Sequence, residues 1–292
     1  MNYWAFRVAS TVFGVLPEWA VRRIGQLLGR LAWIRAEKRR HNATRAMARV
    51  LGEAPDQPGA RSVDLARSLF ESYGRYWAET FWIRPRRVAS IGKHIKVEGI
   101  EHFRDALANG TGVIFALPHV GNWEVAGTVA IAEGAELLAV AEKLKDQRIV
   151  DWFVGLRKAL GIDVVIATGR DKVFETCSDA LRRNAAVALL ADRNLSGRGV
   201  LVSFFGEETR LPVGPARLAL ETGAPIVPVG SFFQNGRGHR VSIKAAVPVA
   251  VDDDVASLTM KVGRALEDLI REAPEQWHMV QPNWPSDRQL RP

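Results

Sequence analysis

The sequence predicts an α/β protein in which a mostly parallel central sheet is flanked by helices, with a helical, membrane-associating segment at its N-terminal end. Two observations predict it. From about residue 94 onward, near-continuous runs of Val, Ile and Leu alternate with amphipathic stretches, which is typical of parallel strands buried on both faces. Before residue 83, apolar residues recur at helical spacing instead. A chain of 292 residues with 47% hydrophobic content can fill one large core. We therefore expect one domain, helical over 1–83 and α/β over 94–292.

The first expected helix, between Asn2 and Pro17, is apolar except for a narrow polar stripe. Its apolar surface consists of Trp4, Phe6, Val8, Val12, Phe13 and Val15. The helix is too short to span a bilayer, and residues 1–50 carry ten Lys or Arg against two acidic residues. These features favour a helix on an anionic membrane, with the basic residues from Arg22 to Arg49 facing lipid headgroups. The alternative is a helix that packs on the body of the protein or on a second subunit.

The helical part continues beyond the turn-rich segment GEAPDQPGA (52–60). Apolar residues there follow i, i+3, i+4 spacing, which predicts a helix with a stripe facing the core. The stripe consists of Ala66, Leu69, Phe70, Tyr73, Trp77 and Phe81.

The rest of the sequence divides into alternating strands and helices. Strands are expected within 111–118, 135–142, 162–168, 185–192, 224–233 and 239–251, and helices within 122–132, 147–160, 170–183, 214–222 and 255–273. Functional groups in such sheets collect beyond the carboxyl ends of strands. Two expected strand ends carry ionisable residues, His119 and Asp192.

The turn HVGNWE (119–124) combines a histidine with a carboxylate. Gly121 favours a turn and Asn122 favours a helix N-cap, which places Glu124 in the first turn of the next helix. We therefore expect Glu124 to hold one ring nitrogen of His119 and leave the other free as a general base.

The sequence offers no protein nucleophile for this base. It has no G-x-S-x-G motif, and its one cysteine, Cys177, falls within an expected helix. No phosphate-binding loop, H-E-x-x-H motif or His/Cys cluster is present, so we expect no metal and no bound cofactor. The nucleophile is then expected to be a hydroxyl group of the substrate.

The formal net charge of +8 and an isoelectric point near 10.0 imply an anionic partner. Nucleic acid, a phosphorylated substrate and a membrane surface all fit a positive charge. Because the basic residues gather beside the apolar first helix and no nucleic-acid-binding motif occurs, we expect a membrane and no nucleic acid.

Several motifs occur in an order that resembles a known family. HVGNWE (119–124), FFGEETRLPVGPARLAL (204–220) and GAPIVPV (223–229) resemble the glycerolipid acyltransferase superfamily with its His-x4-Asp motif, and more closely its bacterial lipid A late acyltransferase branch. ALLADRNLSGRGVLVSFFG (188–206), EQWHMVQPNW (275–284) and RRHNATRAMARVLG (39–52) are most similar to the actinobacterial phosphatidylinositol mannoside acyltransferases. This chain departs from the superfamily by having Glu124 where aspartate is usual.

The resemblance implies roles for individual residues near the turn. His119 matches the catalytic base, Glu124 the motif carboxylate, and Asp192 a further acidic or polar group near the histidine. A strand-end cap paired with Arg193 is the alternative for Asp192. Arg157 matches a family arginine that faces the site, where it would bind phosphate or the thioester oxygen; a solvated helix face is its alternative.

A second set of residues is implied in substrate binding. Phe205, Gly206, Thr209 and Arg210 occupy the place of the superfamily's Phe-Pro-Glu-Gly-Thr-Arg block, which binds phosphate on the acceptor, although the order differs here. Arg198 in LSGRG (195–199) is a candidate for binding an anionic headgroup, and an ordinary turn is the alternative for this loop.

Together these features predict a peripheral O-acyltransferase at the cytoplasmic face of the plasma membrane. The resemblance implies acyl-CoA as co-substrate, with acyl carrier protein as the alternative donor. It implies a mannose hydroxyl of a phosphatidylinositol mannoside as acceptor, with a lipid A precursor or another glycolipid as the alternative. His119 would take the hydroxyl proton, and backbone N–H groups with Arg157 would stabilise the oxyanion. A protein that binds anionic lipids without catalysis is the alternative from another class.

Overall fold

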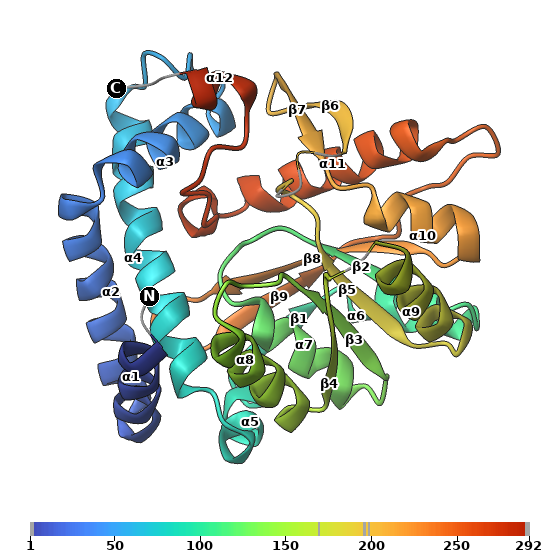
Figure 1. Cartoon of the computed structure of the whole chain (residues 1–292), viewed down its shortest axis with the longest axis horizontal. Helices are drawn as coiled ribbons and strands as arrows, with labels where there is room; N and C mark the ends of the chain where they lie inside the picture. The colour runs from blue at the N-terminus through green and yellow to red at the C-terminus, as the bar shows by residue number, and fades with distance from the viewer. Residues whose placement is uncertain (1–2, 169, 195–196, 198, 290–292) are drawn as a thin grey trace.

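The computed structural model describes residues 3–168, 170–194, 197 and 199–289. Its centre is a seven-stranded sheet in the order β1-β9-β8-β2-β5-β3-β4 (Figure 1). The strands are β1 (Ile95–Glu98), β2 (Val113–Leu117), β3 (Leu137–Ala141), β4 (Ile162–Ile166), β5 (Ala186–Leu190), β8 (Ile226–Phe233) and β9 (His239–Ile243). Neighbouring strands are parallel except β8 and β9, which are antiparallel. The predicted α/β class with a mostly parallel sheet is confirmed.

Helices cover both faces of this sheet. Alternate residues of β2 face opposite cores, since Ile114 packs in one hydrophobic cluster and Phe115 in the other. One face is covered by α6 (Ile100–Ala108), α7 (Trp123–Ala132) and α8 (Gln147–Ala159), and the other by α9 (Arg170–Arg182), α10 (Gly214–Thr222) and α11 (Val255–Arg271). The near-continuous apolar runs of the strands follow from this burial on both sides.

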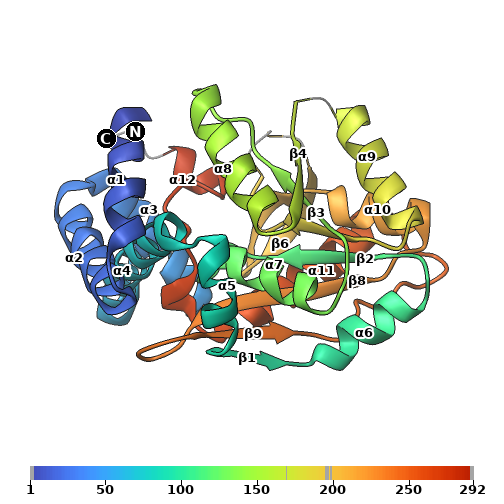
Figure 2. The same cartoon turned by 90° about the horizontal axis from the view of Figure 1, so that it is seen from below.

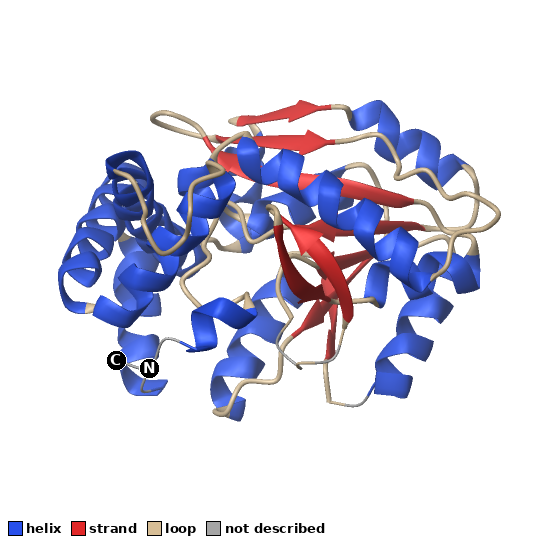
Figure 3. Ribbon diagram, turned by 90° about the horizontal axis from the view of Figure 1, so that it is seen from above, coloured by secondary structure: helices blue, strands red, loops and turns tan. Residues whose placement is uncertain are grey.

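The helical part lies beside the sheet (Figures 2 and 3). It consists of α1 (Tyr3–Val15), α2 (Glu18–Arg35), α3 (Glu37–Val50) and α4 (Ala60–Trp82), and α5 (Pro85–Gly92) leads into the sheet. Glycines let α2 and α4 approach closely: a Cβ on Gly29 would lie 2.1 Å from the carbonyl oxygen of Phe70, and one on Gly74 would lie 2.1 Å from that of Gly25. The stripe predicted on α4 is mostly buried, with Tyr73 and Trp77 half-buried.

The apolar surface predicted for α1 is divided between the interior and solvent. Phe6 is fully buried, with its ring centroid 4.8 Å from those of Phe81 and Trp152, and Phe13 is also buried. The exposed members are Trp4, Val8, Val12 and Val15. The helix therefore packs on the protein through one face and leaves the other apolar face uncovered within the described chain.

Two basic residues expected to face lipid headgroups do not do so. Arg45 and Arg49 are buried, and both contact Asp287 of the short helix α12 (Pro285–Gln289), at 2.9 and 3.0 Å. They hold the C-terminal segment against α3, which corrects their expected exposure.

Among the residues that the structure describes, no helix combines the length and the apolar character needed to cross a membrane.

Two features of the sheet differ from the sequence prediction. The strand expected over 239–251 ends at Ile243, and β1 was not predicted because its four residues include Lys96 and Glu98 and form no apolar run. A separate hairpin, β6 (Val200–Phe204) and β7 (Glu207–Leu211), was also missed. Its two-residue turn, Phe205 and Gly206, has φ of 51° and 78°, as hairpin turns of this length prefer.

Candidate active site

His119 and Asp192 meet because they follow neighbouring parallel strands. Leu117 and Leu190 are partners in the register of β2 and β5, and His119 and Asp192 each lie two residues beyond them. The ring Nδ1 of His119 is 2.6 Å from Asp192 Oδ1, and the backbone N–H of His119 donates to Oδ2 at 3.0 Å. A histidine is thus fixed to a carboxylate at the carboxyl edge of the sheet, with 15% of its side chain exposed.

Asp192 is completely buried and stays ionised. Burial alone raises its pKa, but the charge and hydrogen bonds of His119 and a hydrogen bond from Trp277 lower the pKa of Asp192 to about 2. The indole Nε1 of Trp277 donates to Oδ2 at 2.7 Å, and Asn283 Nδ2 donates to the backbone oxygen at 3.2 Å. An ionised carboxylate only accepts hydrogen bonds, so in the neutral form of His119 the ring proton resides on Nδ1 and Nε2 keeps its lone pair.

Glu124 does not hold His119 as the sequence predicted. Its two carboxylate oxygens accept from Nε and Nη2 of Arg157, at 2.9 and 2.6 Å. Glu124 lies in the first turn of α7 as expected, but α8 brings a guanidinium whose fork matches the carboxylate. Asp192 therefore takes the orienting place that was expected for Glu124.

Arg157 is buried and paired with Glu124, so the alternative of a solvated helix face is wrong. Only 13% of its side chain is exposed, and burial, which disfavours its charge, is outweighed by Glu124, so that its pKa is raised above the ordinary value. The two residues form a buried, bidentate ion pair between α7 and α8.

The backbone N–H groups of the turn, residues 119–122, all donate hydrogen bonds within the protein. The N–H of Val120 donates to Pro118, that of Gly121 to Gln276 and that of Asn122 to Ser231. Together with the His119 N–H on Asp192, these contacts fix the turn. Val125 N–H donates to Asn122 O at 3.1 Å, so the N–H groups of Trp123 and Glu124, at the start of α7, are the backbone donors that follow the turn.

Asn122 precedes α7 as predicted, but its side chain does not cap the helix. Its Nδ2 donates to Glu79 of α4 at 3.2 Å, and His239 Nε2 lies 2.8 Å from the same carboxylate oxygen. Burial raises the pKa of Glu79, but His239 and Arg75 outweigh it and lower the value to about 2. A buried ionic network therefore ties the turn that carries His119 to the helical part.

A second histidine lies behind the first. The backbone N–H of His278 donates to the carbonyl oxygen of His119 at 2.9 Å, and its ring Nε2 is 3.0 Å from Ser72 Oγ. Burial, assisted by the charge of His119 and opposed by Asp192, lowers the pKa of His278 to about 3. His278 is therefore neutral at physiological pH.

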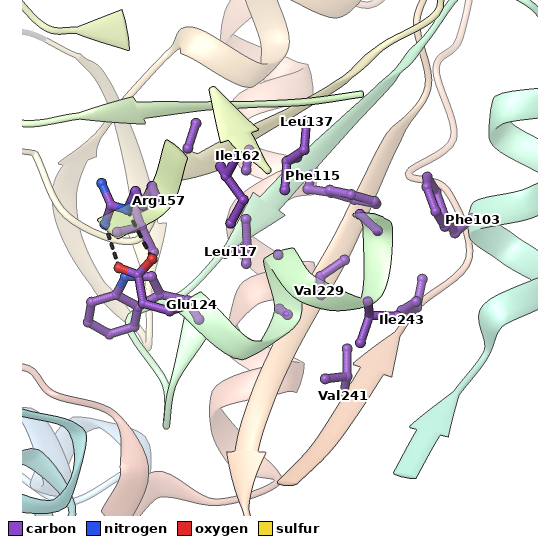
Figure 4. Close-up of a pocket in the computed structure, with 18 of the residues that line it drawn as sticks. Phe103, Phe115, Leu117, Glu124, Leu137, Arg157, Ile162, Val229, Val241 and Ile243 are labelled. Carbon is purple, nitrogen blue, oxygen red and sulfur yellow. Dashed lines mark hydrogen bonds and ion pairs between the residues drawn. The ribbon is translucent and has the colours of Figure 1, made fainter. Parts of the chain in front are cut away.

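An apolar cavity of about 60 Å³ lies between α7 and the sheet (Figure 4). In Figure 4, the Glu124–Arg157 pair lies at one end of the lining and Phe103 at the other. Its lining side chains include Phe103, Phe115, Leu117, Leu137, Ile162 and Val229. Trp123 also lines it, and the ring centroid of Trp123 is 5.3 Å from that of His119. The His119–Asp192 pair and the cavity are thus neighbours.

Two of the four residues predicted on the hairpin, Phe205 and Thr209, contact residues that hold Asp192. Phe205 and Thr209 are buried, and Thr209 Oγ1 donates to the backbone oxygen of Asn283, whose side chain contacts Asp192. Gly206 completes the hairpin turn, and Arg210 is exposed and donates to Gly199 O at 2.8 Å. Arg198 lies outside the described residues.

The alternative pairing for Asp192 is wrong: the nearest acid to Arg193 in an ion pair is Glu142, at 3.8 Å, while Asp192 pairs with His119. Trp277, Asn283 and Glu79 were missed as site residues. The first two lie in the EQWHMVQPNW segment, whose tryptophans and asparagine in a short polar stretch are the signal that was available. In the described part of the chain, no three His, Cys, Asp or Glu side chains gather in a way that could hold a metal ion.

Comparisons with known proteins identify the family of this chain. The family model "Bacterial lipid A biosynthesis acyltransferase" matches residues 1–286. A phosphatidylinositol mannoside acyltransferase of Mycobacterium tuberculosis (strain H37Rv) is 36% identical over 287 residues, which is 97% of this chain and 89% of that protein. One of Mycolicibacterium smegmatis is 35% identical over 282 residues, which is 96% of this chain and 86% of that protein. The chain is therefore an acyltransferase that belongs to the bacterial lipid A biosynthesis acyltransferase family.

Proposed function

We propose that this protein transfers a fatty acyl chain from acyl-CoA to a mannose hydroxyl of a phosphatidylinositol mannoside, working at the cytoplasmic face of the plasma membrane. One observation carries the proposal: the buried, ionised Asp192 holds Nδ1 of His119 and leaves Nε2 as a base next to an apolar cavity. The relatives support this acceptor, because both are named phosphatidylinositol mannoside acyltransferases and both match nearly the whole chain.

The reaction follows from this pair. Nε2 of His119 accepts the proton of the acceptor hydroxyl while the oxygen attacks the thioester carbonyl, a step worth roughly 10²–10⁴-fold in rate. Asp192 stabilises the imidazolium that forms. The tetrahedral intermediate then expels the CoA thiolate, which takes the proton from Nε2, so that the products are the ester and free CoA.

The apolar cavity supports an acyl donor, because it is lined by aliphatic and aromatic side chains. At about 60 Å³ it is smaller than the roughly 150 Å³ that takes up benzene in other proteins. A long chain therefore enters only if lining side chains move. The Glu124–Arg157 pair joins α7 and α8 and is proposed to keep one end of the cavity closed.

Peripheral membrane binding is supported by exposed apolar side chains on two neighbouring helices. Those on α1 are Trp4, Val8, Val12 and Val15, and those on α2 are Trp19, Ile24, Leu27, Leu28, Leu31 and Ile34. A soluble surface seldom gathers so many. A diacylated acceptor stays in the bilayer, and CoA is cytoplasmic, so the encounter is proposed at the inner membrane surface.

A lipid A precursor or another glycolipid is the second candidate acceptor, since the family model is named for lipid A biosynthesis. Acyl carrier protein remains the alternative donor. A carrier without catalysis is disfavoured, because the family and the relatives are acyltransferases.

The test is release of CoA thiol from palmitoyl-CoA with phosphatidylinositol mannosides in neutral detergent, with products identified by mass spectrometry. The wild-type protein should form an acylated mannoside, and His119→Ala should reduce its rate by orders of magnitude. Acylation by a folded His119→Ala protein at the wild-type rate would refute the base. Acylation of lipid A precursors alone would assign the second acceptor.

A further inference from the structure

A cleft of about 510 Å³ lies between α2, α4 and the turn that joins β8 to β9. Its lining includes Arg22, Arg23, Arg30 and Arg75, together with Trp19 and Leu27. Four arginines from two helices therefore surround one space outside the site described above.

Positive charge at this cleft exceeds the negative charge of its partners. Glu18 lies 3.8 Å from Arg22 but is shared with Arg237, at 2.9 Å. Arg30 pairs with Glu71, at 2.8 Å, and Arg22 also donates to the carbonyl oxygen of Gly236. Arg23 has no ion-pair partner among the described residues, so it is the arginine of the cleft whose charge is left unpaired. Burial, opposed by Glu18 and assisted by the charges of Arg75 and Arg237, lowers the pKa of Arg22. Gathering these guanidinium groups is unfavourable, and a bound anion would relieve it.

Arg75 is the buried member of the group, with 5% of its surface exposed. Its Nε donates to Glu79 at 2.7 Å and its Nη1 donates to the carbonyl oxygen of Gln234 at 3.3 Å. Its Nη2 is buried and has no hydrogen-bond partner among the described residues. A buried guanidinium nitrogen without an acceptor is unfavourable, and phosphate oxygens match the guanidinium fork.

Helix α2 also carries apolar side chains beside its arginines. Trp19, Arg23 and Arg30 share one face of α2 by their spacing, and the neighbouring face carries Leu27 and Ile34, which are 55% and 68% exposed. In a helix that lies in a membrane interface, apolar side chains enter the acyl region and cationic ones stay at the level of the phosphates. This arrangement fits a lipid phosphate better than a soluble anion.

We propose that the cleft binds the phosphate group of an anionic phospholipid at the membrane surface. The inference rests on the membrane-peripheral part of the proposed function and adds a defined headgroup site to it.

The first test compares two double variants in binding to phosphatidylcholine vesicles that contain phosphatidylglycerol. Arg22→Ala/Arg23→Ala removes two charges from the cleft, and Arg35→Ala/Arg39→Ala removes two exposed charges outside it. Each cation near the surface accounts for roughly a fivefold change in affinity. The cleft variant should lose at least tenfold more than the control, and an equal or smaller loss would overturn the proposal.

A conservative variant distinguishes recognition of the phosphate by guanidinium groups from general attraction between positive charge and an anionic surface. It also gives a test if the alanine variant fails to fold. Arg22→Lys/Arg23→Lys keeps both charges but loses the guanidinium fork. A site predicts a loss of several-fold on the same vesicles. Affinity equal to that of the wild type would mean diffuse attraction and would overturn the proposal.

The second test identifies the source of the phosphate. Dihexanoyl phosphatidylglycerol, below its micelle concentration, and inorganic phosphate are each titrated into the wild-type protein in a calorimeter. The lipid should bind at least tenfold more tightly, and the cleft variant should lose this binding. Equal or tighter binding of inorganic phosphate, or no binding of the lipid, would overturn the lipid assignment.

These measurements are independent of acyl transfer. CoA release by the wild-type protein in neutral detergent tests the reaction by itself. If the protein binds the lipid but does not transfer an acyl chain, the cleft assignment holds and the proposed reaction fails. If it transfers an acyl chain but the cleft does not bind the lipid, the reaction holds and the cleft assignment fails.

Discussion

The two oxygens of Asp192 have different partners, and this difference determines the protonation state of His119. Oδ1 faces the ring Nδ1, while Oδ2 accepts from two donors, the His119 backbone N–H and the Trp277 indole. An asparagine at position 192 would have to place its amide oxygen on the two donors. Its NH₂ would then face Nδ1, which would have to accept, and the ring proton would move to Nε2.

Asp192→Asn should therefore abolish the base without changing the fold. We expect kcat for CoA release to fall by roughly 10²–10⁴-fold, as when the orienting carboxylate is lost from other histidine bases. Circular dichroism should match the wild type. Asp179→Asn, which changes an exposed carboxylate on α9, is the matched control and should leave kcat unchanged. A kcat for Asp192→Asn within tenfold of the wild type would contradict the tautomer assignment.

The lowered pKa of His278 predicts that the free energy of unfolding falls in acid. Its pKa is about 3 in the folded protein against the ordinary 6.5, so between these values the unfolded chain binds a proton that the folded chain does not. This contribution to stability is intact above pH 6.5 and is lost as the pH falls toward 3. From pH 7 to pH 5 it amounts to about 2 kcal/mol.

His278→Gln removes this titration while keeping a side chain that can bond Ser72. Urea unfolding at pH 7 and pH 5 should show a fall in unfolding free energy that is about 2 kcal/mol smaller in the variant than in the wild type. His102→Gln, on the surface side of α6, is the control and should behave as the wild type. Equal falls in wild type and His278→Gln would show that His278 is not held neutral.

At the level of elements, the sequence predicted well what periodicity controls. The strands β2 to β5 and β8 and the helices α7 to α11 lie within the expected ranges, because long apolar runs and amphipathic spacing are local signals. β1 carries no such signal. The β6–β7 hairpin depends on a positive φ at Phe205, and a phenylalanine in the sequence does not indicate a positive φ. β9 ends at Ile243, although the apolar residues that suggested a longer strand continue to Val251.

The site was predicted in part for the same reason. His119 and Asp192 could be assigned to strand ends from local pattern, but their pairing requires β2 and β5 to be neighbours, and one sequence does not fix strand order. Glu124 was assigned to His119 because both lie in one turn. Its true partner, Arg157, is 33 positions away on α8 and could be placed only by the packing of that helix.

The wall that α7 contributes to the cavity leads to a prediction about acyl-chain length. A Cβ on Gly127 would lie 2.7 Å from Cδ1 of Ile162 and 3.3 Å from Cδ2 of Leu137, both of which line the cavity. Gly127→Ala should narrow it and lower kcat/KM for palmitoyl-CoA relative to octanoyl-CoA by about tenfold, since one methyl group in such a pocket is worth roughly 1–3 kcal/mol. Gly155→Ala on α8, where no atom lies within 4 Å, is the control. If the ratio of kcat/KM for palmitoyl-CoA to that for octanoyl-CoA is the same in both variants, the acyl chain does not bind in this cavity.

On the scale of the whole molecule, α1 and α2 face solvent with apolar side chains while their other faces are packed. α1 is anchored through Phe6 and Phe13, and α2 is anchored through the glycine contact with α4. Removing residues 1–16 would therefore also open the core around Phe81. Exposed residues of α1 give a sharper test of membrane binding, because their replacement leaves the packed face intact.

Val8→Asn/Val12→Asn should weaken binding to anionic vesicles most clearly at high salt. Salt screens the attraction of the basic residues but not the burial of apolar surface. Each valine contributes about 1 kcal/mol if it enters the bilayer, so the pair should lower the partition coefficient at high salt by roughly 30-fold, measured by co-sedimentation. Val249→Asn/Val251→Asn makes the same change at exposed residues after β9 and should have no effect. Equal partitioning of both variants would assign membrane binding to a surface other than α1.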